Sequence, residues 1–395
     1  MLSPEMLDLG TRRSVIREIF EFGNKRAAEI GRENVFDFSL GNPSIPAPDC
    51  VKNAILELAG SGDSCLLHGY TSAQGALDVR RAIAEYISKT HAVNITADDI
   101  YMTCGAAASL IISLKAMCVP GDEFVVFAPY FPEYKVFIEA VGGKFVLIPP
   151  RVPDFQISPD DLSSAITEHT KGVIINSPNN PSGVIYSESS IKALCSVLEE
   201  KSAEYGHQIF LIADEPYREL VFDSETQVPY LMNYYAETLV CYSYSKSLSL
   251  PGERIGYIAV SPRMTDAKEM YAAICGAGRA LGFVCAPSMF QQIVARCQGQ
   301  TGDISAYRKN RDILYDGLVR LGYECVHPDG AFYLFVKSPE PDDSAFCERA
   351  KKYDILIVPG EGFGAPGYVR LAYCVSQDTI ERSLSAFEKL MKEYK

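Results

Sequence analysis

The residues with the clearest chemical potential surround Lys246, in the run Ser243-Tyr244-Ser245-Lys246. Two serine hydroxyls precede the lysine, and Arg254 follows it eight residues later. A lysine amine can hold an aldehyde as a Schiff base, and hydroxyls beside a guanidinium can hold a phosphate dianion. Pyridoxal 5′-phosphate (PLP) carries both groups. The same short motif also occurs as a solvated polar turn, so further residues are needed to decide between the two interpretations.

Polar residues follow several predicted strands, at the edge where open α/β sheets bind ligands. Asp214 comes directly after the strand Ile209–Ala213, and its carboxylate could pair with a protonated pyridine nitrogen. That pair would keep the ring cationic and able to accept electrons, although the same residue could simply cap a helix. Asn180 and Tyr217 could each donate a hydrogen bond to the phenolic oxygen of the ring. Asn180 also lies in a proline-rich turn whose role could be structural alone.

Small and aromatic residues follow two other strands. Gly105, Ala106 and Ala107 separate the strand Ile100–Thr103 from a helical pattern. Backbone N–H groups at the start of a helix attract anions, although small residues also begin many buried helices. Phe131 could stack on a flat ring or pack in the core.

Arg370 lies inside the apolar run Tyr368–Ala372 near the C-terminus. A buried guanidinium must be paired, because its desolvation is otherwise too costly. Its partner could be an acidic side chain of the protein or the carboxylate of a substrate, held in a bidentate fork.

The composition limits the classes of partner. The 395 residues carry a net charge of −13, which argues against a nucleic-acid partner. No apolar run reaches the roughly 18 residues of a membrane span, and the first residues do not resemble a secretory signal. The 12 cysteines are scattered without a Cys-x-x-Cys pair, which predicts reduced thiols in the cytoplasm. The five histidines are far apart, so no metal site is expected.

The pattern between about residue 50 and residue 295 predicts the sheet that positions these groups. Short apolar, β-branched runs alternate there with helical stretches, which indicates a mostly parallel sheet with helices on both faces. The seven runs are Ile100–Thr103, Phe124–Phe127, Phe145–Ile148, Val173–Asn176, Ile209–Ala213, Leu239–Tyr242 and Ile255–Val260. The predicted fold class is therefore α/β, with a seven-stranded sheet.

The last hundred residues change character. A long helical stretch over Pro287–Leu321 leads into the strand Phe332–Val336, then a helix, a short strand at Ile355–Val358 and a final helix. We expect a smaller α+β domain over 296–395, joined by the N-terminal segment 1–48. Residues 49–295 would form the large PLP-binding domain.

From Gly41 to Arg370, the order and spacing of these motifs resemble class I/II aminotransferases, the fold type I PLP enzymes related to aspartate aminotransferase. The resemblance implies that Lys246 is both the covalent anchor of the cofactor and the proton carrier. It also assigns Asp214 to the pyridine nitrogen, with Tyr134 as its support, and Tyr217 and Asn180 to the phenolic oxygen. Phe131 would stack on the ring face. The phosphate would be bound by Ser243, Ser245 and Arg254 and by the backbone of Gly105, Ala106 and Ala107.

The same resemblance extends to the substrate and to a second subunit. Arg370 matches the residue that grips the α-carboxylate, and the segment around Gly41 resembles the one that folds over the substrate. Tyr70 lies in a loop like the one whose tyrosine reaches the phosphate of the neighbouring subunit, which implies a homodimer with shared active sites. The bonds Ala128-Pro129 and Asn180-Pro181 occupy positions that are often cis in the family.

This chain departs from the pattern of some family members at a position that contacts the side chain of the substrate. Some bacterial aspartate aminotransferases have a lysine where this chain has Ala107, and that lysine binds the side-chain carboxylate of the substrate. Arg279 lies close to where other members present a partner-subunit arginine for the same purpose. Ile16, Ile19 and Phe20 are candidate apolar contacts for a substrate side chain.

The expected reaction is a ping-pong transfer of an amino group between an L-amino acid and a 2-oxo acid. A PLP-dependent carbon–sulfur β-lyase, or a decarboxylase, on the same fold would use the same Lys246, Asp214 and Arg370, so the motifs leave these alternatives open. A non-catalytic PLP-binding regulator is a third alternative. The complete catalytic set and the lack of an appended basic domain argue against it. The sequence leaves the amino donor open.

Overall fold

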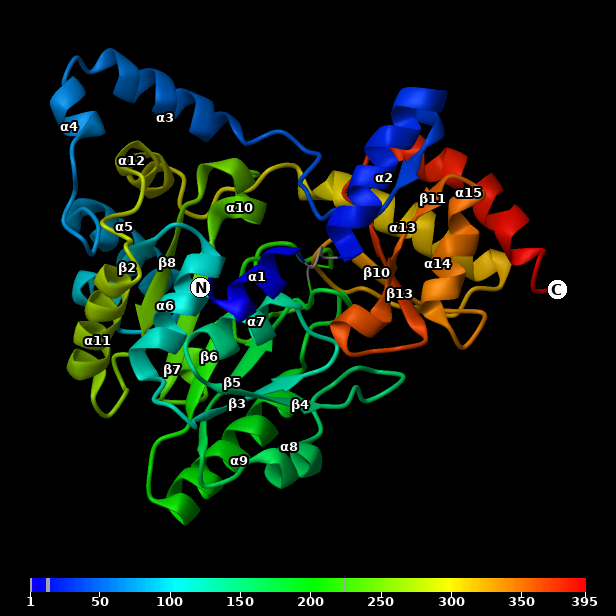
Figure 1. Ribbon diagram of the computed structural model, residues 1–395. Helices are drawn as coiled ribbons and strands as arrows, with labels where there is room; N and C mark the ends of the chain where they lie inside the picture. The colour runs from blue at the N-terminus through cyan, green and yellow to red at the C-terminus, as the bar shows by residue number, and fades with distance from the viewer. Residues whose placement is uncertain (1, 12–14, 224) are drawn as a thin grey trace.

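The centre of the molecule is a seven-stranded sheet in a computed structural model that describes residues 2–11, 15–223 and 225–395 (Figure 1). The strand order is β2-β8-β7-β6-β5-β3-β4. The strands are β2 (Ile100–Thr103), β3 (Glu123–Phe127), β4 (Lys144–Ile148), β5 (Thr170–Asn176), β6 (Phe210–Asp214), β7 (Thr238–Ser243) and β8 (Gly256–Val260). β8 runs in the direction opposite to the other six strands of this sheet. The prediction of a seven-stranded, mostly parallel sheet is confirmed.

Helices cover both faces of this sheet because alternate strand residues point to opposite sides. Ile174 and Ile212 pack toward one face, whereas Val173, Ile175 and Leu211 pack toward the other. The first face is covered by α6 (Ala106–Met117), α7 (Glu133–Ala140) and α11 (Ala267–Ala280). The second is covered by α3 (Asp49–Gly60), α5 (Leu77–His91), α8 (Pro159–Ala165), α9 (Glu188–Tyr205) and α12 (Ser288–Arg296).

A smaller sheet is built mainly from the C-terminal part of the chain. Its order is β12 (Val358–Pro359), β13 (Tyr368–Ala372), β10 (Tyr333–Lys337) and β9 (Cys325–Val326). The helices α13 (Ile304–Leu321), α14 (Asp343–Lys351) and α15 (Gln377–Met391) pack around it (Figure 1). This smaller α+β part matches the predicted fold class.

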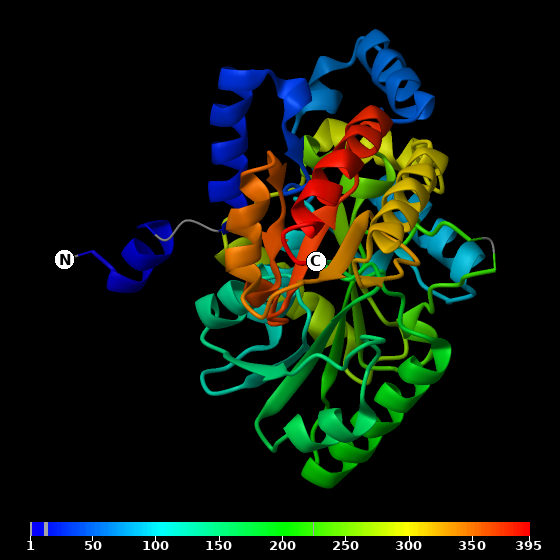
Figure 2. The same cartoon turned by 90° about the vertical axis from the view of Figure 1, so that its right-hand side faces the viewer.

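The N-terminal segment meets this smaller part. The strand β1 (Phe36–Asp37) pairs in parallel with β11 (Ile355–Leu356). The helix α2 (Val15–Ile30) lies beside the smaller part in both views, while α1 (Pro4–Thr11) buries none of its residues (Figures 1 and 2). Two short helices, α4 (Ser64–His68) and α10 (Tyr244–Ser247), complete the α-helices. The exact domain boundaries remain a prediction.

One expected element is wrong. The stretch Pro287–Leu321 is not a single helix, because α12 ends at Arg296 and α13 begins at Ile304. Gly299 between them has a φ of +74°, which a helix does not allow. Asp303 then caps α13, its Oδ1 accepting from the Ser305 N–H at 3.1 Å.

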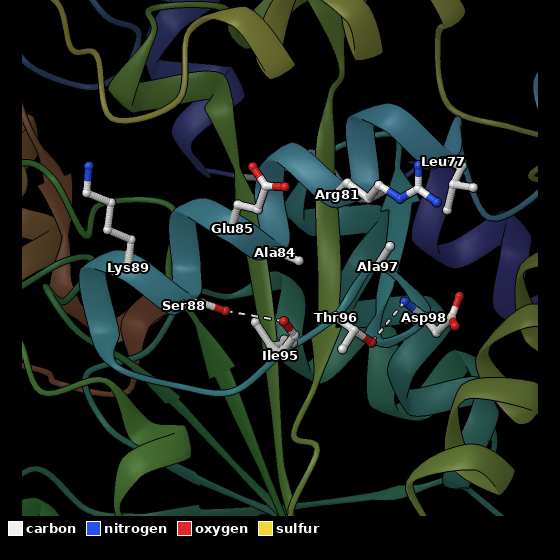
Figure 3. Close-up of a pocket in the computed structure, with 10 residues that line it drawn as sticks. All are labelled: Leu77, Arg81, Ala84, Glu85, Ser88, Lys89, Ile95, Thr96, Ala97 and Asp98. Carbon is white, nitrogen blue, oxygen red and sulfur yellow. Dashed lines mark hydrogen bonds between the residues drawn. The ribbon is translucent and has the colours of Figure 1, made fainter.

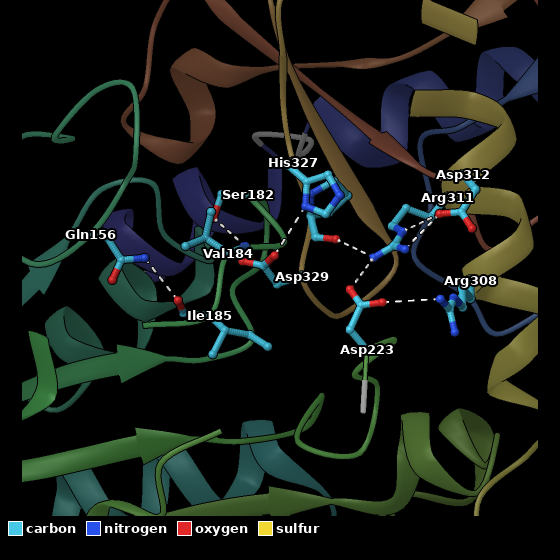
Figure 4. Close-up of polar contacts among 11 residues, drawn as sticks. Gln156, Ser182, Val184, Ile185, Asp223, Arg308, Arg311, Asp312, His327 and Asp329 are labelled. Carbon is cyan, nitrogen blue, oxygen red and sulfur yellow. Dashed lines mark hydrogen bonds and ion pairs between the residues drawn. The ribbon is translucent and has the colours of Figure 1, made fainter. Parts of the chain in front are cut away.

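Ion pairs join the two parts of the molecule (Figure 4). Asp223, from the loop after β6, lies 3.5 Å from the guanidinium of Arg311 and 3.4 Å from that of Arg308, both on α13. Arg311 is buried and also donates to the carbonyl of Pro328. No helix in the described ranges combines the length and apolar character needed to cross a membrane.

Candidate active site

A cavity of about 590 Å³ opens where β5, β6 and β7 end and the smaller sheet approaches them. Parallel strands present their carboxyl ends at one edge, so residues distant in the sequence meet there. The predicted site residues that line it are Gly41, Ala106, Ala107, Phe131, Asn180, Asp214, Tyr217, Ser243, Ser245, Lys246, Arg254 and Arg370. Gly105, Tyr70 and Arg279 do not line it.

Lys246 lies in the one-turn helix α10, directly after β7. Its Nζ donates a 2.6 Å hydrogen bond to the carbonyl of Gly41. Burial lowers the pKa of this amine to about 8, and the positive charges of Arg370 and Arg254 act in the same direction. A substantial fraction of the amine is therefore neutral near physiological pH, as a nucleophile or a base requires.

Asp214 ends β6 deep in the cavity. The hydroxyl of Tyr134 donates to its Oδ2 at 2.5 Å, as expected. Its buried Oδ1 has no hydrogen-bond partner among the described residues. Burial raises the pKa of Asp214 to about 7, and the Tyr134 bond only partly opposes this. A buried carboxylate oxygen left in this way fits a cationic N–H donor such as a pyridinium.

Arg370 is held between two aromatic rings. Its guanidinium carbon lies 4.7 Å from the ring centroid of Tyr333 and 4.9 Å from that of Phe363. Two of its nitrogens donate to the Asn180 Oδ1 at 3.1 Å and to the Ser39 carbonyl at 2.6 Å. Its Nε is buried without a partner among the described residues, and burial lowers the pKa of the group. No carboxylate of the protein pairs with it in the contacts described, which favours the substrate alternative.

The end of the cavity near α6 can hold a phosphate. The Ser243 and Ser245 hydroxyls lie 2.8 Å apart, and Arg254 donates to Ser245 at 3.4 Å. Gly105 precedes the first residue of α6, with a φ of +89°. A Cβ on Gly105 would lie 2.7 Å from Nη2 of Arg254, and the positive φ also favours glycine at this position. The helix start, the hydroxyls and the guanidinium form one anion cradle.

The residues present therefore fit PLP. The cradle suits a phosphate, the unpartnered Oδ1 of Asp214 suits a pyridinium, and Lys246, whose pKa is lowered to about 8, lines the same cavity. Phe131 lines the same cavity, and its ring meets that of Tyr134 edge-on, with 5.6 Å between centroids. The peptide bonds Ala128-Pro129 and Asn180-Pro181 are both cis, as expected.

Tyr333 is a site residue that the sequence did not single out. Its hydroxyl lies 2.9 Å from that of Tyr217, and it leaves no room for a Cβ on Gly41. The sequence shows it only as one aromatic residue in a β-strand run, because its contacts depend on how the smaller sheet meets the larger one.

The remaining predicted residues lie elsewhere. Tyr70 is 88% exposed in the single chain, and Arg279 is exposed at the end of α11. Of the apolar candidates, Ile16 lines the cavity, whereas Ile19 is buried against the smaller part and Phe20 does not reach the cavity.

A second hollow, of about 710 Å³, lies between α5 and the 3₁₀ turn η2 (Ala97–Asp99) (Figure 3). Charged side chains of both signs line it, among them Arg81, Glu85, Lys89 and Asp98. It shares no lining residue with the cavity at Lys246. None of the predicted cofactor residues lies there, so it is not the cofactor site.

Comparisons with known proteins agree with this geometry. The family model for aminotransferase class I and II matches residues 33–387. A probable aspartate/prephenate aminotransferase of Thermus aquaticus is 29% identical over 392 residues, covering 93% of this chain and 95% of that protein. The crystal structure of an amino transferase from Eubacterium rectale has a TM-score of 0.98 at 58% identity, covering 100% of this chain and 99% of that one.

A more distant solved structure shows the same fold. The aspartate aminotransferase of Thermus thermophilus, determined with maleate, has a TM-score of 0.85 at 26% identity, covering 99% of this chain and 100% of that one. The family model, the relatives and the solved structures all extend over most of the chain, including the cavity at Lys246. The chain belongs to the class I and II aminotransferase family.

Proposed function

We propose that this aminotransferase binds PLP in the cavity at Lys246 and uses it to move an amino group from an L-amino acid to a 2-oxo acid. The observation that carries the proposal is the convergence of three unsatisfied or activated groups on one cavity. These are the amine of Lys246, the unpartnered Oδ1 of Asp214 and the unpartnered Nε of Arg370.

The cofactor would be held at three points besides Lys246. Ser243, Ser245, Arg254 and the start of α6 bind its phosphate, Asp214 its pyridine nitrogen, and Asn180 and Tyr217 its phenolic oxygen. Bound PLP supplies an aldehyde for reversible attachment to amines and a ring that accepts electrons. Because Asn180 Oδ1 accepts from Arg370, its amide N–H groups are the ones available to the cofactor.

The substrate steps are carried by two residues. Arg370 orients the α-carboxylate through a bidentate contact, and fixed orientation of this kind can remove several kcal/mol from the barrier. Nζ of Lys246 would take up the α-proton of the substrate and later release it, so this residue would act as the proton carrier. Its pKa of about 8 suits a base that must both accept and release a proton. An amino acid and an oxo acid then use the same site in turn, which gives ping-pong kinetics.

A second copy of the chain would complete the site. Tyr70 is almost fully exposed in one subunit, and its hydroxyl would reach the phosphate in the other. The proposed functional unit is therefore a homodimer with two shared active sites.

The test is product analysis with the purified protein and PLP. A donor amino acid and a 2-oxo acid should yield a new amino acid, and Lys246→Ala should abolish the reaction. Pyruvate, ammonia and homocysteine from cystathionine, with no amino acid formed from the added 2-oxo acid, would instead indicate a carbon–sulfur β-lyase.

A further inference from the structure

The cavity has an apolar wall beside Arg370. Ile16, Val358 and Phe363 pack together in one hydrophobic cluster, and all three line the cavity. Val358 is also the strand partner of Arg370 in the smaller sheet. The ring of Phe363 lies against the guanidinium of Arg370. A substrate whose carboxylate is bound by Arg370 therefore has this wall, called here the Ile16 wall, within reach of its side chain.

The charges of the cavity do not match a second carboxylate. In the described part of the chain, its cationic lining residues are Lys246, Arg254 and Arg370. The first is assigned to the cofactor aldehyde, the second to the phosphate and the third to the α-carboxylate. The remaining charged lining residues, Glu133 and Asp214, are both acidic. An added carboxylate would lose its hydration, and the described lining residues offer it no further cation.

We propose that the amino donor carries an uncharged, apolar side chain that packs on the Ile16 wall. This inference rests on the proposed function, and it names the substrate class of that site. Ala107, which lines the α6 end of the cavity, adds no cation there either. Burying a leucine-sized side chain there gains binding energy that aspartate would forgo.

The experiment compares leucine, asparagine and aspartate, whose side chains share one branched shape and differ in polarity and charge. Single-turnover reactions of the PLP-loaded enzyme are followed by cofactor absorbance, so that no oxo acid with its own second carboxylate is needed. Leucine should exceed aspartate by at least about tenfold in the apparent second-order rate constant. Equilibrium binding of 4-methylpentanoate should likewise be tighter than that of succinate.

Two variants test the wall itself. Ile16→Lys should lower the rate constant for leucine and raise that for aspartate, because it replaces an apolar contact by a cation. Glu18→Gln, on the exposed part of the same helix, changes the net charge by the same amount and should leave both unchanged. Equal effects of the two variants would overturn the assignment of the wall.

Preference for aspartate over leucine in the unmodified enzyme would overturn the inference but leave the aminotransferase function intact. Arg279→Ala identifies the reason in that case. Selective loss of aspartate reactivity in this variant would show that the partner subunit supplies the missing cation. Failure of all three amino acids to react would overturn the proposed function as well.

Discussion

The hydroxyl of Tyr134 donates a 2.5 Å hydrogen bond to Oδ2 of Asp214, while Oδ1 of the same carboxylate is buried without a partner among the described residues. One oxygen thus fixes the orientation of the group, and the other is left for a ligand. A carboxylate held in this way is unfavourable without its cationic partner. Asp214 should therefore lower the free energy of unfolding of the cofactor-free protein.

Replacing Asp214 by asparagine should stabilise the cofactor-free protein, and the gain should depend on pH. Burial raises the pKa of Asp214 from 3.8 to about 7, so the unfolded chain loses this proton at a lower pH than the folded protein. The resulting penalty is absent below about pH 4, grows as the pH rises, and is complete above about pH 7. Urea denaturation should show a larger advantage of the variant at about pH 8 than at about pH 5. An equal advantage of the variant at both pH values would contradict the raised pKa of Asp214.

Tyr134→Phe is the matched variant for the hydrogen bond. Since this bond lowers the pKa of Asp214, its loss should raise that pKa, so the penalty should still begin near pH 4 but become larger and reach completion at a higher pH. The variant should also bind PLP more weakly, because the carboxylate is less often charged at neutral pH. Equilibrium dialysis of PLP against both proteins measures the difference.

The capture of PLP by Lys246 should follow the titration of its amine. Only the neutral amine attacks an aldehyde, and burial lowers the pKa of this group to about 8. The rate constant of covalent attachment to the cofactor-free protein should therefore rise with pH and level off above about pH 8. Stopped-flow absorbance measures it, and borohydride reduction followed by peptide mapping identifies Lys246. A rate that still rises steeply near pH 10, like that of an exposed lysine, would contradict the burial effect.

The larger sheet could be predicted almost strand for strand because all its strands except the edge strand β4 are buried on both faces. Such strands appear in the sequence as short continuous apolar runs, as in Ile100–Thr103, which matches β2 at both ends. The sequence pattern does not reveal the break in the predicted helix Pro287–Leu321, because glycines such as Gly299 and Gly302 are not decisive inside a helical pattern. The positive φ of Gly299 in the structure marks the position of the break.

The cofactor residues could be predicted because they follow strands in a fixed order, which restricts where their side chains can meet. Tyr333 could not, because its contact with Tyr217 joins two different sheets. The apolar wall at Ile16 was visible only as scattered candidates. Packing of α2 against β12 decides that Ile16 faces the cavity and Ile19 does not.

Arg370→Lys should lower kcat/KM for an amino acid by at least about 30-fold, corresponding to a loss of about 2–5 kcal/mol. Lysine keeps the charge but loses the fork that contacts Asn180, Ser39 and the substrate carboxylate together. Single-turnover kinetics with leucine measure this loss. 3-Methylbutylamine, which is leucine without its carboxylate, is the control and should react equally with both proteins. An equal loss for the amine would indicate a distorted site instead.

Arg311→Ala should lower the free energy of unfolding by about 2 kcal/mol. Its buried guanidinium packs on the ring of Phe222, contacts Asp223 and donates to the Pro328 carbonyl, so its removal leaves a void where the two parts meet. Arg308 contacts the same Asp223 from a side chain that is 53% exposed. Arg308→Ala should therefore cost less than about 1 kcal/mol. Urea denaturation of both variants gives the comparison, and equal losses would contradict the role of burial.

Mixing two inactive or weakened variants should restore activity if Tyr70 serves the neighbouring subunit. Tyr70→Phe removes the hydroxyl that would contact the phosphate, which should weaken PLP binding by about tenfold or more. Lys246→Ala removes the covalent anchor. In a hybrid of the two, one site combines both changes, whereas the other has Lys246 from one chain and Tyr70 from its partner. At a limiting PLP concentration, refolding the variants together should therefore yield fully functional sites that neither variant has alone. If Tyr70 acted within its own subunit, or not at all, each site of the hybrid would keep the defect of its own chain, and mixing would yield only the average of the two activities.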